Sequence, residues 1–457
     1  MKIAVVTPSH DVRHLSEAWA SLKMQSVKDW VWVVMVNDPK GDVDNLDKMT
    51  RQVSAMVTDE SGEQDNRVVI YGDKMALSAS QGVGLRKRAA FMTAIQDVKA
   101  DVLVELDHDD LLVPTALQEI GKAFADEEVD FFYSDAAYFE PDGKPQGTPS
   151  YMRPDVRKAW QNNGFEFYVA DIEGVRPGKY VCPVAFEPSP VSFSLVYWAP
   201  DHVRVWRSSF YERVGGHNAE LELCDDHDLL CKTFVHARKM VHHAAPLYLY
   251  RHWDSNTWAA KVDRIRQLTY QNENRWIEAM AAAHCKRSGL LAIDLGGLHD
   301  GPGAPWVPVD GDMRVRALPG GVQADLSERW PFEDGSVGAI RAHDFLEHLS
   351  DPMQAMKEAY RVLAPGGLFL TRTPSTDGRG AFQDPTHKSW WNQNSFWYWT
   401  RRQQSKYLPP RYQHVRFQPL VLDTWFPSDW HKENKISYVE AHLVALKDGY
   451  KGPGEMQ

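Results

Sequence analysis

The chain has 457 residues, of which 43% are hydrophobic and 11% aromatic, enough for more than one packed core. Its formal net charge of -11 argues against a binder of duplex DNA, because such proteins usually present a basic face, although this leaves room for a local basic groove. The sequence contains no run of about 18 apolar residues and opens with no secretory signal. It therefore predicts a cytoplasmic protein with reduced cysteines and no transmembrane segment.

The first half alternates apolar, strand-like runs with segments of helical periodicity. Strands are expected at 2–8, 30–38, 67–72 and 101–107, with helices at 14–26 and 85–98. This alternation predicts a mainly parallel α/β sheet. Ligands of such sheets gather at the carboxyl ends of the strands, where we expect Asn37–Asp38 and Asp107–Asp110.

The regular pattern weakens from about 140 to 200, where proline, glycine and aromatic residues dominate. We interpret this region as a long irregular excursion, and such loops are often functional. Regular structure is expected to resume near residue 202, and a long helix is expected at 261–287. These features predict two domains, residues 1–287 and residues 288–457.

Four acidic residues crowd the end of the expected strand at 101–107: Glu105, Asp107, Asp109 and Asp110. Unpaired buried carboxylates are costly, so a positive partner is expected. A divalent cation would answer this need, since carboxylate oxygens suit Mg²⁺ or Mn²⁺. Such a cation makes a diphosphate a better leaving group. Taken alone, the cluster is more typical of a solvated acidic turn.

Four segments occur in a distinctive order along residues 1–260. They read VNDPKGD at 36–42, LDHDDLLVPTAL at 106–117, VGGHNAELELCDDHDLLCK at 214–232 and YRHWDSNT at 250–257. In this order they resemble family 2 glycosyltransferases of the GT-A fold. The resemblance implies a Rossmann-like mixed sheet with helices, a nucleotide-sugar donor and bound Mn²⁺ or Mg²⁺.

The resemblance assigns roles in donor binding residue by residue. Pro8 and Asp38 would line the pocket of the nucleotide base, and Arg88 would reach the base or the diphosphate. Asp107 would touch both ribose and metal, while Asp109 would bind the metal directly. A UDP-sugar is the first expectation for the donor, although TPSHD and VNDPKGD depart from the family's usual base-binding sequences.

The resemblance also assigns the remaining catalytic parts. His252 would be a third metal ligand, and Asp226 would be the base that takes a proton from the acceptor hydroxyl, giving inversion. Asp226 would serve equally as a helix cap. Asp225 stands where the family has glutamate, and Gly215 and Gly216 would let the acceptor or donor sugar approach.

Three tryptophans, Trp198, Trp206 and Trp253, are candidates for stacking on sugar faces, with packing in a core as the alternative.

The second half begins a new α/β alternation at about residue 289. Its segments LLAIDLGG, VPVD, PFEDGSV, EHL and RVLAPGG resemble class I S-adenosylmethionine-dependent methyltransferases over about residues 290–375. The resemblance implies a Rossmann-like α/β sandwich. It also implies S-adenosylmethionine held by Asp294, Gly296 and Gly297, with Asp310 on the ribose and with Asp325 and Leu326 beside the adenine.

The chain departs from the methyltransferase pattern at one position, and a further candidate segment follows the matched region. Leu298 occupies a position where the family prefers glycine, which leaves open whether the domain methylates or is a retained scaffold. The following segment QDPTHKSWWNQNSFWYW, residues 383–399, is a candidate acceptor pocket with His387 as a base. An aromatic core or interface is the alternative reading of the same segment.

Together these features predict a metal-dependent inverting glycosyltransferase whose second domain O-methylates the glycan or binds the acceptor, which would be a glycan, a lipid-linked molecule or a protein. Three alternatives stay open. One is a methyltransferase whose first domain only binds a glycan, and another is an inactive scaffold. The third is a phage-type enzyme that glycosylates DNA or virion protein, because the basic and aromatic residues at 397–407 are suited to stacking on nucleic acid bases.

Overall fold

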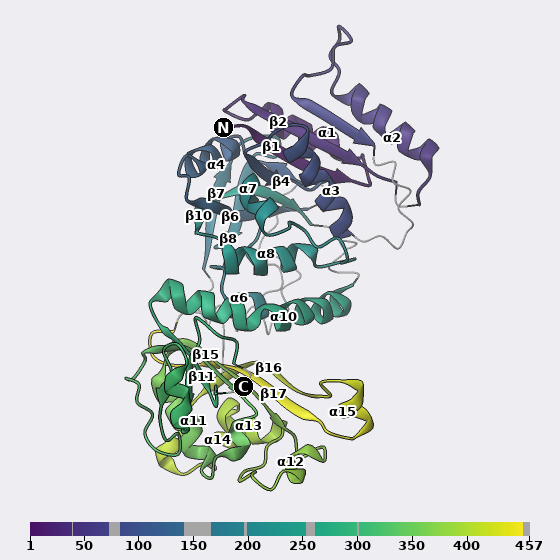
Figure 1. The fold of residues 1–457 in the computed structure, drawn as a ribbon. Helices are drawn as coiled ribbons and strands as arrows, with labels where there is room; N and C mark the ends of the chain where they lie inside the picture. The colour runs from purple at the N-terminus through teal and green to yellow at the C-terminus, as the bar shows by residue number, and fades with distance from the viewer. Residues whose placement is uncertain are drawn as a thin grey trace. The chain divides into compact units, whose positions relative to one another are not determined.

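The computed structural model describes residues 1–38, 40–72, 83–140, 166–195, 199–252, 261–298 and 301–450 (Figure 1). Its internal contacts divide these residues into two compact units. The first unit comprises the described residues up to 188 and from 199 to 274, and the second comprises 189–195 and the described residues from 275 onward. Helix α10 (Val262–Ser288) continues from one unit into the other. The predicted domain boundary at 287/288 falls at the end of this helix and stays a prediction.

The first unit is built on a mixed sheet with the strand order β3-β2-β1-β4-β9-β6-β10-β5. Its strands are β1 (Ile3–Ser9), β2 (Trp30–Val36), β3 (Val68–Gly72), β4 (Val102–Glu105), β5 (Leu111–Leu112), β6 (Val129–Phe139), β9 (Arg204–Arg207) and β10 (Lys239–Arg251). The strand β9 runs antiparallel to both β4 and β6, and β10 runs parallel to β6. The carboxyl ends of β1, β2, β4, β6 and β10 therefore meet at one edge, together with the beginning of β9.

Helices on the first unit's sheet are α1 (Leu15–Lys23), α2 (Val43–Met56), α3 (Val83–Gln96), α4 (Ala116–Phe124), α7 (Ser208–Arg213) and α8 (Asp225–His236). Their apolar faces close the core. In α1, for example, Trp19 stacks on Trp32 of β2 with ring centroids 5.7 Å apart. In α4 the buried residues Leu117, Ile120 and Phe124 recur at helical spacing, so that one face packs inward.

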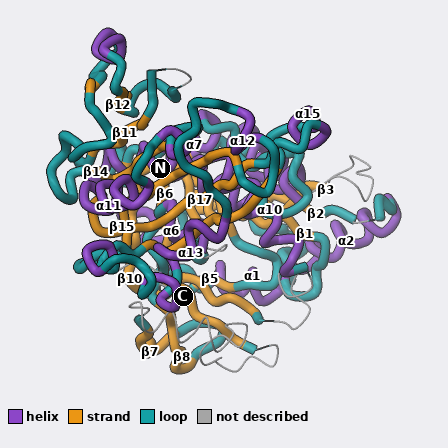
Figure 2. Tube along the Cα trace, turned by 90° about the horizontal axis from the view of Figure 1, so that it is seen from below, coloured by secondary structure: helices purple, strands orange, loops and turns teal. Residues whose placement is uncertain are grey.

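The prediction that residues 140–200 are irregular is wrong for part of that range. Strands β7 (Phe167–Ile172) and β8 (Gly178–Pro183) form a separate antiparallel pair, seen in Figure 2, and α6 (Pro190–Leu195) follows. The pairing runs from Phe167 opposite Pro183 to Ile172 opposite Gly178, so the hydrogen bonds of the ladder stabilise segments whose side chains show little periodicity. Residues 141–165 and 196–198 lie outside the described residues.

The second unit contains a seven-stranded sheet with the order β13-β12-β11-β14-β15-β17-β16. The strands are β11 (Leu291–Leu295), β12 (Val307–Asp310), β13 (Val322–Gln323), β14 (Val337–His343), β15 (Leu363–Pro374), β16 (Phe417–Trp425) and β17 (Tyr438–Ala445). The first five strands in this order are parallel, and β17 is antiparallel to both of its neighbours. This mainly parallel α/β arrangement is the fold that the sequence predicted.

Short and long helices cover the second sheet. They are η1 (Met313–Ala317), η2 (Leu346–His348), α11 (Pro352–Val362), α12 (Gly380–Gln383), α13 (Gln393–Thr400), α14 (Arg402–Ser405), η3 (Pro410–Tyr412) and α15 (Asp429–Glu433). The start of α11 is fixed by Asp351, whose carboxylate accepts the amide hydrogens of Met353 and Gln354. Among the described helices, none combines the length and apolarity needed to cross a membrane.

Candidate functional site

The acidic cluster of the first unit has a protein cation at its centre. Lys87, on α3, places its Nζ 2.5 Å from Oε1 of the fully buried Glu105 at the end of β4. Burial opposes the charge of Lys87, but Glu105, Asp107, Asp225 and Asp226 together hold its pKa well above the ordinary value. Burial also disfavours the charged form of Glu105, yet Lys87 lowers the pKa of Glu105 to about 2. Lys87 is thus one answer to the need for a positive partner.

Asp110 has a structural environment of its own. The hydroxyl of Tyr248 donates to its Oδ2 at 2.8 Å, and the amide of Arg251 donates to its Oδ1 at 2.7 Å. Burial, followed by the charges of Asp109 and Asp107, raises the pKa of Asp110 well above its usual value. These contacts tie the acidic loop to the end of β10.

The two predicted metal ligands of the same loop, Asp107 and Asp109, are half-buried, and 32% of the Asp107 side chain is exposed. His202, just before β9, brings its Nε2 to 3.9 Å from Asp107 Oδ2. The ring of His10, which follows β1, packs edge-to-face on the ring of His108, with the ring centroids 4.8 Å apart. The ends of β1 and β4 therefore meet, as the strand order requires.

The predicted base, Asp226, lies in the first turn of α8 and has 33% of its side chain exposed. Its Oδ2 accepts a hydrogen bond of 2.8 Å from Arg204, a guanidinium that is 1% exposed at the start of β9. Burial disfavours the charged form of Asp226, but Arg204 and then Lys87 hold its pKa far below the usual range. The carboxylate of Asp226 is therefore ionised and accessible at neutral pH.

Asp225 differs from its neighbour. It is 3% exposed, and its Oδ2 lies 3.8 Å from Nε2 of the buried His217. Burial raises the pKa of Asp225 to about 7, with Lys87 opposing and Asp226 adding to the shift. Asp226 is thus the more exposed of the two neighbouring carboxylates, and Asp225 is the buried one.

The two glycines predicted to admit substrate form the turn after α7. Both have positive φ, +79° at Gly215 and +60° at Gly216. A Cβ at Gly216 would lie 2.4 Å from the ring of Tyr211, whereas none of the described atoms lies within 4 Å of a Cβ at Gly215. The contacts of Gly216 therefore give it a packing role, and the open side of the turn is at Gly215.

The residues predicted to bind the nucleotide lie at or beside the same edge of the sheet. Pro8 is half-buried near the end of β1. Asp38, after β2, is 8% exposed and accepts from the amides of Lys40 and Asp42 and from the side chain of Asn45. Those bonds, the amide of Asp42 first, lower its pKa. Arg88 is exposed on α3, one residue after the inward-facing Lys87.

His252 follows β10 at the same edge of the sheet, and its Nδ1 lies 3.9 Å from Oε2 of Glu140. The rest of its motif, residues 253–257, lies outside the described residues. Within the described ranges, the group of three or more metal-type side chains whose ligand atoms lie within 4.8 Å of one another is in the second unit. The predicted set of Asp107, Asp109 and His252 therefore stays a proposal.

Sequence reasoning missed Lys87, Arg204 and His202. For Lys87 a signal was present, because it shares the helical spacing of the buried residues Gly84 and Phe91. Of the tryptophans, Trp206 is fully buried and donates from Nε1 to Thr233 Oγ1 at 3.0 Å, so it packs in the core. Trp198 and Trp253 lie outside the described residues.

In the second unit the predicted S-adenosylmethionine turn follows β11. Gly296 has φ +73°, and a Cβ there would lie 3.0 Å from Phe345 Cδ2. A Cβ at Gly297 would lie 2.7 Å from Asp294 Oδ2. Asp294 itself is 1% exposed and accepts from Arg341 at 2.9 Å, and burial raises its pKa. Its buried Oδ2 has no hydrogen-bond partner among the described residues.

The other predicted contacts of S-adenosylmethionine lie at the next strand ends. Asp310 ends β12 and accepts the amide hydrogen of Asp312. Asp325 is exposed and caps a turn through Ser327, while Leu326 is 6% exposed. Because β11, β12 and β13 are parallel, these positions share the carboxyl edge with the glycine turn.

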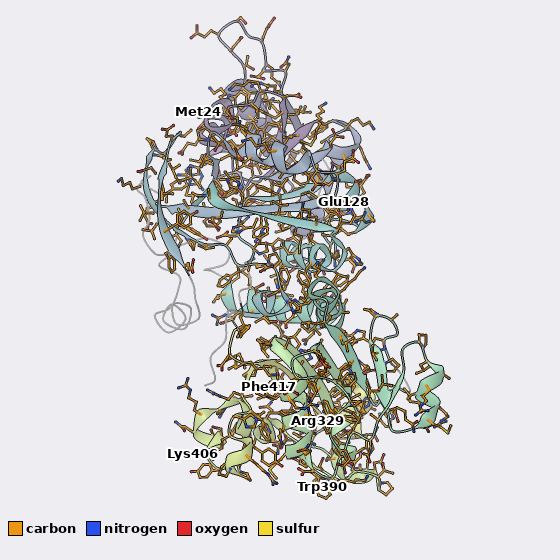
Figure 3. All side chains as sticks on the ribbon, turned by 90° about the vertical axis from the view of Figure 1, so that its left-hand side faces the viewer. Met24, Glu128, Arg329, Trp390, Lys406 and Phe417 are labelled. Atoms are coloured by element: carbon orange, nitrogen blue, oxygen red, sulfur yellow. The ribbon has the colours of Figure 1, made fainter. Side chains whose placement is uncertain are left out.

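The aromatic segment after β15 divides between core and surface. Trp391, Phe396 and Trp399 belong to the buried core, whereas Trp390 is 56% exposed and is labelled at the lower end of Figure 3. His387 lies beside His348 and Glu347, and its role as a base stays a prediction. Burial raises the pKa of Glu347 to about 7, although the hydroxyl of Thr373 opposes the shift.

Comparison with known proteins bears on the second unit. A family model described as a methyltransferase domain matches residues 312–371. A probable S-adenosylmethionine-dependent methyltransferase of Mycolicibacterium smegmatis is 39% identical over 61 residues, 12% of this chain and 24% of that protein. The ubiquinone/menaquinone biosynthesis C-methyltransferase UbiE of Brucella anthropi is 31% identical over 137 residues, 24% of this chain and 52% of that protein. The chain thus spans about half or less of the length of these relatives.

The second unit therefore contains a methyltransferase-like domain, as its sequence predicted. A crystal structure of S. aureus TarS residues 1–349 in complex with UDP is 14% identical, with a TM-score of 0.38, over 64% of this chain and 72% of that chain. We infer neither fold nor function from a likeness of that size. The mixed α/β fold of the first unit follows from its own strand order.

Proposed function

We propose that the first unit transfers a sugar from a nucleotide-sugar to an acceptor hydroxyl, with inversion at the anomeric carbon and with a UDP-sugar as the first donor to test. The observation that carries the proposal is the pairing of Asp226 with Arg204 beside the carboxyl edge where Asp107 and Asp109 lie. The charges of Asp107 and Asp226 both raise the pKa of Lys87, so the two carboxylates act on one cation.

Each group then has a chemical task. The exposed carboxylate of Asp226 would take the proton of the acceptor hydroxyl while that oxygen attacks the sugar. Arg204 would keep Asp226 ionised and oriented. Asp107 and Asp109 fit a divalent cation, because they are half-buried oxygen donors two positions apart in one loop. Mn²⁺ or Mg²⁺ bound there would neutralise charge on the diphosphate.

The test is release of nucleoside diphosphate from a panel of UDP-, GDP- and dTDP-sugars, with Mn²⁺ or with a chelator. We expect Mn²⁺-dependent release of UDP, lost in Asp226→Asn while UDP binding is kept. Equal turnover with and without chelator would contradict the metal dependence. If no nucleotide-sugar binds, the alternative of a glycan-binding unit attached to a methyltransferase is favoured.

For the second unit we propose binding of S-adenosylmethionine and methylation of the glycan or acceptor. Support comes from the orphan Oδ2 of Asp294 beside the Gly296–Gly297 turn, since an ammonium of the ligand's amino-acid end is the kind of donor such an oxygen accepts. Equilibrium dialysis tests it: binding should weaken at least ~10-fold in Asp310→Ala, because each lost hydrogen bond to a ligand costs on the order of 1–3 kcal/mol. Binding unchanged by that substitution would contradict the assignment of the ribose contact.

A further inference from the structure

Two imidazoles and a carboxylate converge just beyond the carboxyl end of β14. A ligand atom of each of Glu347, His348 and His387 lies within 4.8 Å of the others. Glu347 is buried, and the two histidines are half-buried. Glu347 and His348 come from η2, whereas His387 comes from a loop almost forty positions later, so the fold rather than the sequence brings the three together.

The two histidines are held in an orientation that suits metal binding. Nδ1 of His387 lies 2.8 Å from the carbonyl oxygen of Ala381. Nδ1 of His348 lies 3.4 Å from the carbonyl oxygen of Thr386. A carbonyl oxygen only accepts, so each Nδ1 carries the hydrogen and each Nε2 keeps its lone pair in the neutral ring. This arrangement of histidine and carbonyl typically orients imidazole ligands around a metal.

The carboxylate of Glu347 is held from β15, and its backbone is held by the loop that carries His387. The hydroxyl of Thr373, near the end of β15, donates to Glu347 Oε2 at 2.6 Å. The amides of Lys388 and Ser389 donate to the carbonyl oxygen of Glu347 at 2.7 and 3.0 Å. The loop that carries His387 is therefore bonded directly to the residue that supplies the carboxylate, so all three donors belong to one rigid arrangement.

We propose that Glu347, His348 and His387 bind a divalent first-row transition-metal ion. Two imidazoles with one carboxylate form a donor set that Zn²⁺, Co²⁺, Mn²⁺ and Fe²⁺ accept, and hard Ca²⁺ would prefer more oxygen. Three protein ligands leave at least one coordination position open, which is typical of catalytic rather than structural sites.

The open coordination position of this ion would bind the methyl acceptor. This role rests on the methyl transfer proposed above, but the metal site itself does not depend on it. The turn at Gly296 approaches Phe345, two residues before Glu347, so the predicted methyl-donor turn and the metal site are neighbours. Phe382 and Trp390 flank His387 in sequence and are 64% and 56% exposed. Exposed rings carried by the same segment as a ligand of the Lewis acid suit a sugar, with its apolar ring face and its hydroxyl oxygens.

The experiment is a titration of the full-length protein with Co²⁺, followed by visible absorption and by competition with Zn²⁺. We expect a Co²⁺ site with visible absorption in the second unit, whose affinity falls at least ~10-fold in His348→Asn and in His387→Asn, since even outer partners of a ligand contribute ~10–100-fold. Asparagine can reproduce the Nδ1 donor while removing Nε2. The matched control is His414→Asn, an exposed histidine of the same unit, which should bind Co²⁺ as the unchanged protein does.

Two outcomes would overturn the site. One is a visible Co²⁺ absorption that survives unchanged in the His348→Asn/His387→Asn pair, or that is absent from the unchanged protein. The other is loss of the Co²⁺ signal in Asp109→Ala, which would place the ion in the first unit instead. If the paired variant unfolds, X-ray absorption of the Zn²⁺-loaded unchanged protein decides: two imidazoles are expected in the coordination shell, and a shell without them would contradict the proposal. Failure of UDP to bind would affect only the function proposed for the first unit.

Discussion

The two units both gather acids at the carboxyl edge of a sheet, but they compensate the charge in different ways. In the first unit, permanent side-chain cations do so: Lys87 pairs with Glu105, and Arg204 pairs with Asp226. In the second unit, Glu347 meets a threonine hydroxyl and two imidazoles. The first arrangement fixes ionised carboxylates for proton transfer. The second suits a metal ion, because each Nδ1 faces a carbonyl oxygen and leaves Nε2 for the metal.

The largest loss of activity should come from replacing Asp226, the proposed base of the Arg204–Asp226 pair. In Asp226→Asn, the amide oxygen can still accept from Arg204, but it cannot take a proton. Sugar transfer, or hydrolysis of the donor, should fall by about 10²–10⁴-fold, the usual contribution of a general base. Steady-state kinetics with titration of UDP separates this loss from a binding defect. A rate within about threefold of the unchanged enzyme would mean that another group is the base.

Removing a cation from the same cluster should cost folding stability. Lys87→Met leaves Glu105 buried and unpaired, which typically costs about 3–5 kcal/mol. Arg88→Met is the matched control, because that side chain is exposed on the same helix, and its effect should stay within about 0.5 kcal/mol. Unfolding in urea followed by circular dichroism measures both. An equal loss of unfolding free energy in Lys87→Met and Arg88→Met would contradict the assignment of Lys87 as the partner of buried Glu105.

The pair also predicts a pH dependence. The pKa of Glu105 is lowered from 4.5 to about 2 in the folded chain, so the unfolded state binds the proton more readily. Its contribution, about 3 kcal/mol, is fully present above pH 4.5 and is lost as the pH falls towards 2. The difference in unfolding free energy between the unchanged protein and Lys87→Met should therefore shrink over that window. A difference that stays constant from pH 6 to about pH 3 would contradict this reading.

The smallest effects distinguish the two glycines after α7. Gly216→Ala should cost about 2 kcal/mol, because it adds a clash with Tyr211 to the strain of positive φ. Gly215→Ala should cost about 1 kcal/mol, because its Cβ meets open space. Thermal unfolding compares the two. The reverse order would show that the turn is packed differently from the arrangement described.

Much of this architecture could be predicted from the sequence, because apolar runs and helical periodicity are local signals. The long helix expected at 261–287 is α10, and the alternation of the second half gives its parallel sheet. The hairpin of β7 and β8 was missed, since its ladder depends on pairing across a turn and not on a pattern within one strand.

The site residues show the same limit. Asp107 and Asp226 were predicted from motifs, but their protein partners Lys87 and Arg204 were not. Arg204 reaches the edge only because β9 runs opposite to its neighbours, a fact of topology that no local pattern carries. His387 was predicted as a base, and its neighbours in η2 become visible only once the loop at 384–389 is folded onto them.

The central claim is most directly tested by calorimetric titration of the full-length protein with UDP in the presence of Mn²⁺, repeated with Asp109→Ala and with the exposed-site control Asp29→Ala. The account predicts metal-dependent binding of UDP that is lost in Asp109→Ala and kept in Asp29→Ala. Binding of UDP that ignores both Mn²⁺ and Asp109, or failure of every nucleotide tested to bind, would contradict it.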